Sequence, residues 1–252
     1  MRPEGRWVAR ISHAGFVLVL AIVASSAFIR LAAGVPEVPA DFIAGARLAH
    51  RLSASIAGLV VLVVAWLVFT RDEKPRADLA LAGATLAVML ALAWVGRYSG
   101  PEAPAAVLVT NLAGGLVLST LLWAVAARQS VAAGAAEHAP GRAWPVATLA
   151  VVSAQSLTGA MAVTEFAKVG PVHHWAGLAA FALCVWTGLR LARSNALRGT
   201  GIAIVALAAL QAAVGACALA LSLPLWLVLA HNVSAALLLA ALAQAVVRGL
   251  PR

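Results

Sequence analysis

Histidines near the ends of apolar segments are the residues of this sequence best suited to chemistry. His173 and His174 are adjacent in PVHHWAGLAAF, His50 begins HRLSA, and His231 lies within LVLAHNVSAALLL. An ionisable side chain is costly inside a membrane and is by default a functional residue there. A lone histidine at a membrane edge can simply bond a backbone carbonyl, but several at one depth indicate a shared ligand. Two neutral imidazoles on facing helices can bind a haem iron from both sides.

The residues around these histidines favour haem over zinc. A structural zinc site normally needs four ligands, and no cluster of cysteines or carboxylates accompanies the histidines. The two cysteines, Cys184 and Cys217, lie inside apolar segments and are expected to be core residues. Small residues that would leave room for a flat macrocycle follow each histidine: Ala54 and Gly58 after His50, Gly177 and Ala180 after His173, and Ala235 and Ala236 after His231.

The elements that must position the histidines are membrane helices. The 252 residues are 63% hydrophobic and 11% charged, with a mean hydropathy of +0.97, whereas soluble domains are roughly half apolar and a quarter charged. The sequence therefore predicts an all-α integral membrane protein with eight transmembrane helices. The first apolar segment is too long for a signal peptide and is expected to remain in the protein. The predicted spans are residues 12–34, 48–70, 78–96, 104–127, 144–163, 172–193, 201–222 and 224–247.

The basic residues predict the orientation of these helices. Of the 18 lysines and arginines, 13 lie on the side of the membrane that carries both termini. By the positive-inside rule that side is cytoplasmic, so we expect a multi-pass protein of the inner (plasma) membrane with both termini in the cytoplasm. The net charge of +9 follows from this bias, and basic residues spread over short loops do not favour nucleic-acid binding. The 13 residues are Arg2, Arg6, Arg10, Arg71, Lys74, Arg76, Arg128, Arg142, Arg190, Arg193, Arg198, Arg248 and Arg252.

The chain divides into two halves of similar organisation. Residues 107–128 and 227–248 align without a gap at an offset of 120, which places Asn111 opposite His231 and an arginine at the inner end of each segment. Because each half contains four helices, the repeat is parallel, and all four histidines lie near the outer face. We therefore predict two tandem parallel four-helix bundles. They comprise an N-terminal half, residues 1–127, a cytoplasmic linker, residues 128–143, and a C-terminal half, residues 144–252.

Three features of the chain are typical of one known family. These are its two halves, HRLSA at the second span, and LQAAVGACALALSLPLWLVLAHNVSAALLL across the last two spans. In these features the chain resembles the haem A synthase family. The resemblance covers nearly the whole chain. It implies an oxidoreductase that converts the methyl group of haem o to the formyl group of haem A for cytochrome oxidase assembly. It also implies a haem b cofactor in the C-terminal half and haem o as substrate in the N-terminal half. The implied partners are membrane lipid, haem o synthase and cytochrome oxidase assembly proteins.

Carried over by position, the resemblance makes His231 one ligand of the haem b iron and either His173 or His174 the other. We favour His173, because a small residue stands four places after it, as one does after His50. Its neighbour would then face the outer interface or a haem propionate.

In the N-terminal half the resemblance implies His50 and Arg51 as catalytic residues, with His50 a ligand of the substrate haem iron. This half departs from the family pattern, since Asn111 stands where a second histidine is expected and Arg47 where the family tends to carry a glutamate. Two classes of function remain: a haem A synthase-like enzyme, and a non-catalytic haem-binding membrane protein in oxidase assembly or haem handling. A transporter is a weaker alternative, because we expect no membrane-embedded carboxylate to couple protons.

Overall fold

The computed structural model describes residues 3–32, 38–100, 102–130, 143–162 and 169–248. Within these ranges the chain forms eight α-helices and no strand, and all eight are long and apolar enough to cross a membrane. The predicted all-α membrane fold is therefore confirmed, while most of the predicted linker, residues 128–143, lies outside the described residues. The helices are α1 (Pro3–Ala32), α2 (Ala40–Phe69), α3 (Arg76–Gly96), α4 (Ala105–Gln129), α5 (Ala143–Ala162), α6 (Gly170–Ala192), α7 (Arg198–Ala220) and α8 (Leu225–Arg248).

Two helices begin well before the apolar segments that predicted them. α1 begins at Pro3 instead of residue 12, and α2 begins at Ala40 instead of residue 48. Polar residues can continue a helix beyond the apolar region, and in α2 Asp41 in the first turn interacts favourably with the positive end of the helix dipole. His50, the third residue of the predicted span 48–70, is therefore not at the start of the helix. His50 lies about three turns after its start.

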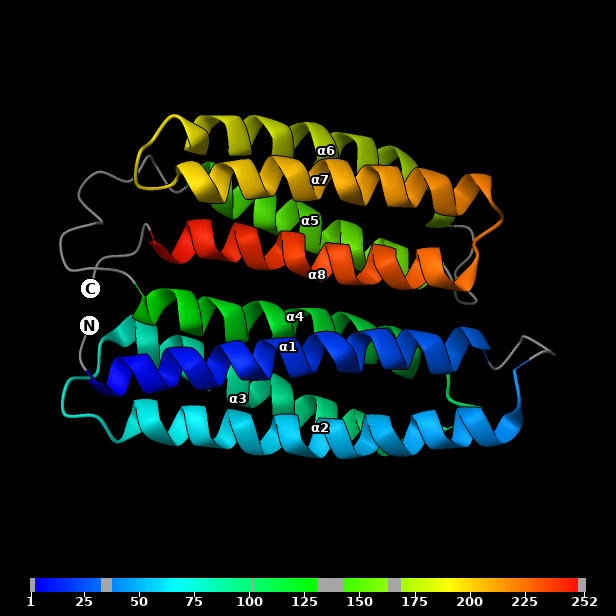
Figure 1. The fold of residues 1–252 in the computed structure, drawn as a ribbon, viewed down its shortest axis with the longest axis horizontal. Helices are drawn as coiled ribbons and strands as arrows, with labels where there is room; N and C mark the ends of the chain where they lie inside the picture. The colour runs from blue at the N-terminus through cyan, green and yellow to red at the C-terminus, as the bar shows by residue number, and fades with distance from the viewer. Residues whose placement is uncertain (1–2, 33–37, 101, 131–142, 163–168, 249–252) are drawn as a thin grey trace.

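Each half is a four-helix bundle with the same order of neighbours. In the first half, α1 and α3 each pack against both α2 and α4. In the second half, α5 and α7 each pack against both α6 and α8. Successive helices alternate in direction, so both termini lie at the same end of the molecule (Figure 1). The structure thus has the predicted tandem parallel arrangement.

The two halves meet mainly through α8, which packs against α4 and α1. One hydrophobic core cluster includes buried residues of both halves, among them Leu122 of α4 and Leu242 of α8. One hydrogen bond joins the two halves, from Trp123 Nε1 to Gln244 Oε1 at 3.1 Å, and within the second half Gln244 Nε2 donates to Thr200 Oγ1 at 2.8 Å. Because lipid offers these polar groups no partners, such bonds favour close packing of the helices.

A network of buried polar side chains lies at the end of the first half that carries the termini. Arg128 Nε donates to Asp78 Oδ1 at 3.1 Å, and Gln129 Nε2 donates to Asp78 Oδ2 at 2.9 Å. Arg71 Nη1 donates to Gln129 Oε1 at 2.9 Å and lies 3.7 Å from Asp78 Oδ2. The burial of Asp78 was not expected from the sequence. Two arginines neutralise this carboxylate at the end of its helix, and their contacts link α3 to α4 and to Arg71, which follows α2.

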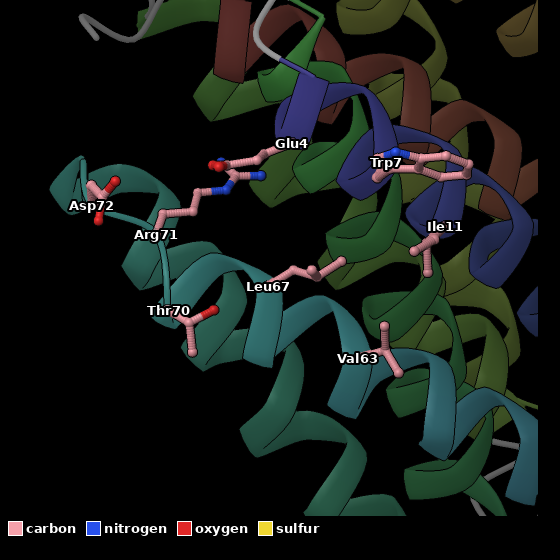
Figure 2. A pocket seen from close by; sticks show the side chains of 8 residues that line it. All are labelled: Glu4, Trp7, Ile11, Val63, Leu67, Thr70, Arg71 and Asp72. Carbon is pink, nitrogen blue, oxygen red and sulfur yellow. The ribbon is translucent and has the colours of Figure 1, made fainter.

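A hollow of about 490 Å³ opens beside this network, between the start of α1 and the end of α2. Figure 2 shows Trp7 and Val63 on its apolar wall and Glu4 and Arg71 near its polar rim. It lies at the opposite end of the bundle from His50, so it takes no part in the histidine sites.

Candidate functional site

The structure brings together His173 of α6 and His231 of α8. Their ring centroids are 6.3 Å apart, and the two rings are nearly perpendicular, at 81°. Two metal–nitrogen bonds of about 2.0–2.1 Å each, together with the distance from each nitrogen to the centre of its ring, span a similar length. The centroid separation therefore matches the length expected for two imidazoles that bind one metal ion.

The ring of His173 is held by α5. Gln155 Nε2 donates to the main-chain oxygen of His173 at 2.5 Å, and the carbonyl oxygen of Gln155 lies 3.2 Å from His173 Nδ1. The side chains of Gln155 and Thr158 also approach Nδ1, at 2.9 and 3.3 Å. The tautomer that donates its Nδ1–H to the Gln155 carbonyl leaves Nε2 free for a metal ion, which is the usual arrangement of a metal-binding histidine.

The ring of His231 is held in a similar way by α7. Gln211 Nε2 lies 3.0 Å from His231 Nε2, and the hydroxyl of Ser234 donates to Gln211 Oε1. The other ring nitrogen, Nδ1, is buried and has no hydrogen-bond partner. A buried polar atom without a partner is rare in proteins and calls for an explanation. A metal ion bound to this nitrogen would supply one, provided that Nε2 carries the ring proton and donates it to the side-chain oxygen of a rotated Gln211 amide.

One short sequence pattern places both glutamines. Gln155 of α5 and Gln211 of α7 are each followed four residues later by a glycine, in QSLTG and QAAVG. This spacing puts the two residues on one face of each helix. A Cβ at Gly159 would lie 2.6 Å, and one at Gly215 2.9 Å, from Cε1 of the histidine that faces it. The glycines therefore let each imidazole lie directly against the neighbouring helix, next to the glutamine that bonds it.

The other site residues predicted in the outer part of the molecule are more exposed. His174 is exposed, with its ring centroid 6.1 Å from that of His173. Arg51 is exposed as well. Of the histidine pair, it is His173 that faces His231.

His50 lies in the first half and is half-buried. Its Nδ1 is 3.0 Å from the hydroxyl oxygen of Ser25 on α1, which donates to the carbonyl of Ile22 at 3.0 Å. A hydroxyl used in this way accepts the Nδ1–H of His50 and leaves Nε2 free. Asn111 of α4 donates from Nδ2 to Ser99 Oγ at 2.5 Å. The first half therefore offers one imidazole where the second half offers two.

The number and kind of side chains available as ligands favour some metal ions over others. In the part of the chain that the structure describes, no group of three or more histidine, cysteine, aspartate or glutamate side chains could hold a metal ion. A pair of histidines does not make a four-ligand zinc site. It does fit an iron ion whose remaining ligands come from a porphyrin.

No family model matches this chain, and no curated protein sequence matches it. The resemblance to the haem A synthase family therefore remains a prediction that rests on the sequence motifs and on the placement of the histidines.

Proposed function

We propose that the second half of this chain binds one haem b between His173 and His231, and that the chain is a haem A synthase-like membrane oxidoreductase. The observation that carries the proposal is the 6.3 Å separation of the two ring centroids, which come from facing helices of one bundle. The buried and unpartnered Nδ1 of His231 supports it. So does the close approach of each ring to a glycine on the neighbouring helix.

The protein's own contribution at this site is to fix the two imidazoles. In the tautomer with a proton on Nδ1, the Gln155 carbonyl accepts that proton from His173, which leaves Nε2 as the ligand atom and makes the ring a stronger ligand. Gln211 and Ser234 fix the ring of His231 from α7 and α8. Haem b bound by two histidines supplies one-electron transfer.

In the first half, His50 is the proposed ligand of the substrate, haem o. Ser25 orients its ring. Asn111 is engaged by Ser99 and provides no second imidazole, so one face of the substrate iron has no histidine. An open face suits a substrate that must be activated and then released. Arg51, which is exposed beside His50, remains a proposed catalytic residue.

The same proposal places both histidine sites near the outer face of the plasma membrane, with both termini in the cytoplasm. Haem o synthase would supply the substrate, and cytochrome oxidase assembly proteins would receive the product.

The spectrum of the purified protein tests the haem b site. Wild-type protein should show a low-spin bis-histidine spectrum and yield haem b on extraction. His231→Ala should lose the low-spin signature. His13→Ala is the matched control, because His13 packs against Trp123, at 5.0 Å between ring centroids, near the opposite end of the helices. A His231→Ala protein with unchanged haem content and spectrum would show that the site is wrong.

The second candidate is a non-catalytic haem-binding protein, which the single imidazole of the first half favours. An assay of haem A production in cells supplied with haem o distinguishes the two functions. If the chain is an enzyme, wild type makes haem A, and His50→Ala stops production of haem A while the haem b of the second half persists. If wild type makes no haem A under these conditions, the enzyme proposal fails and the haem-binding function takes its place.

A further inference from the structure

At its outer end, the interior of the first half changes from apolar to basic side chains. Along α1 the buried face recurs every three or four residues, and its next position is Arg30. Along α2 the buried face continues toward the start of the helix through His50 to Arg47. Two arginines thus stand where core residues would follow. The apolar residues of these faces are Phe16, Val19, Val23 and Ala27 on α1, and Ala57, Val61, Val64 and Val68 on α2.

Parts of both guanidinium groups are buried without partners. Nε and Nη2 of Arg30 and Nε of Arg47 are inaccessible to solvent and have no hydrogen-bond partner. Arginines near a membrane surface usually extend their charge out to the interface. Arg30 instead keeps two unpartnered N–H donors away from solvent and Arg47 keeps one, and an unsatisfied buried donor is unfavourable.

Carboxylates do not balance these charges. Asp41 and Glu102, at the same end of the first half, are both exposed, and neither forms an ion pair with Arg30 or Arg47 within the described ranges. The ion pairs of Asp78 lie at the opposite end of the bundle. Among the described residues, Arg30 and Arg47 therefore have no carboxylate partner at the outer end of the first half.

The second half differs in this respect. Its basic residues in the described part of α5 to α8 are Arg190, Arg193, Arg198 and Arg248, and all of them lie at the end that carries the termini. Half-buried arginines at the histidine end thus accompany the half with one imidazole, and the described part of the half with two has no basic residue at that end.

The arginines lie between His50 and the outer surface. Arg47 precedes His50 by three residues on the same face of α2, which places its Cα about 4.5 Å further out. Arg30 follows Ser25, the partner of His50, by five residues on α1, or about 7.5 Å. A flat ligand bound at His50 would therefore meet both guanidinium groups on its outward side.

We propose that this end of the first half binds the acidic headgroup of an amphiphilic ligand in the membrane, with Arg30 and Arg47 as its charge partners. A guanidinium group donates paired N–H bonds to a carboxylate or a phosphate. The assignment rests on the proposed function in one respect: if the ligand is haem o, the headgroup is its propionate carboxylates and His50 binds its iron. A phospholipid could supply the same anionic chemistry.

Two probes without iron test the charge contacts independently of His50. The protein is purified with its haem b, placed in nanodiscs of zwitterionic lipid, and titrated with metal-free protoporphyrin IX or with its dimethyl ester. Arg30→Gln and Arg47→Gln should each weaken protoporphyrin binding by about tenfold or more, since each removes a charge-assisted contact. Binding of the ester should not change. Arg97→Gln is the matched control, because Arg97 lies at the same end but is exposed and stacks on Trp94 at 3.4 Å.

A second experiment tests whether the bound anion is a lipid headgroup. If the occupant is an anionic phospholipid, native mass spectrometry should show phosphatidylglycerol bound to wild type and to Arg97→Gln but lost from the Arg30→Gln/Arg47→Gln double variant. The proposal is overturned if the double variant binds protoporphyrin and phosphatidylglycerol as wild type does.

The thermal unfolding midpoint distinguishes a ligand-binding role of the two arginines from a structural role. Because the buried N–H groups have no protein partner, the double variant should unfold at the wild-type temperature or above it. A lowered midpoint with unchanged ligand binding would assign the arginines a structural role and overturn the proposal. The low-spin spectrum of the same samples reports separately on the haem b site, so failure of the proposed function is distinguishable from failure of the anion site.

Discussion

Replacing Gly159 by alanine tests whether the imidazole of His173 must lie where the structure places it. The added Cβ would lie 2.6 Å from Cε1 of His173, 3.1 Å from Nδ1 and 3.2 Å from Nε2. Ordinary van der Waals contact begins at 3.4 Å, so Cε1 must move by about 0.8 Å. Metal–ligand distances at a well-formed site vary by only about 0.2 Å. The methyl group should therefore break or weaken the bond between His173 and a haem iron.

The same substitution should leave the fold intact. In a helix interior alanine is more favourable than glycine by about 1 kcal/mol, and the imidazole can turn away from the new methyl group. We expect Gly159→Ala to lose the low-spin bis-histidine signature in absorption and electron paramagnetic resonance spectra, with no decrease in the thermal unfolding midpoint. Gly83→Ala is the control, because a Cβ at Gly83 in α3 meets nothing within 4 Å. If Gly159→Ala keeps the wild-type spectrum and haem content, the reasoning that makes His173 a ligand is wrong.

Two further predictions concern stability and orientation. Asp78→Asn should destabilise the first half by about 3 kcal/mol or more, because it removes the charge of the buried carboxylate that Arg71 and Arg128 contact; an unfolding midpoint equal to that of wild type would contradict this. In a variant lacking Cys184 and Cys217, a cysteine at exposed Glu102 should react with an impermeant reagent in intact cells, while one at exposed Asp72 should react only after lysis. The reverse pattern of labelling would invert the proposed orientation.

The sequence was sufficient to predict the fold because lipid leaves the backbone few choices. Long apolar segments must form helices, and the offset of 120 correctly places Asn111 and His231 at equivalent positions, since each is the seventh residue of its helix. The starts of α1 and α2 could not be found in the same way. Hydropathy marks where a chain enters the apolar region, whereas the helix itself continues through polar residues outside it.

The candidate site could be predicted only in part. The predicted spans of α6 and α8 run in the same direction, so histidines near their starts lie at one depth, which identified His173 or His174 and His231 together. Adjacent residues of a helix point about 100° apart, so the choice within the pair depends on where α8 lies. Gln155 and Gln211 act across helix interfaces, and a single sequence does not reveal such contacts. The repeated spacing of glutamine and glycine was the signal that could have found them.

The contact between α4 and α8 has a consequence for how the two halves of one chain can come to differ. These helices are equivalent members of the two halves, and they pack against each other. A contact between two copies of the same element is what a symmetric dimer forms about its two-fold axis. The molecule has the architecture of a homodimer of four-helix subunits joined into a single polypeptide. In a true homodimer every substitution appears twice, so both sites must change together. Joining the subunits removes that constraint, and one copy can keep its histidine at position 231 while the other carries asparagine at position 111.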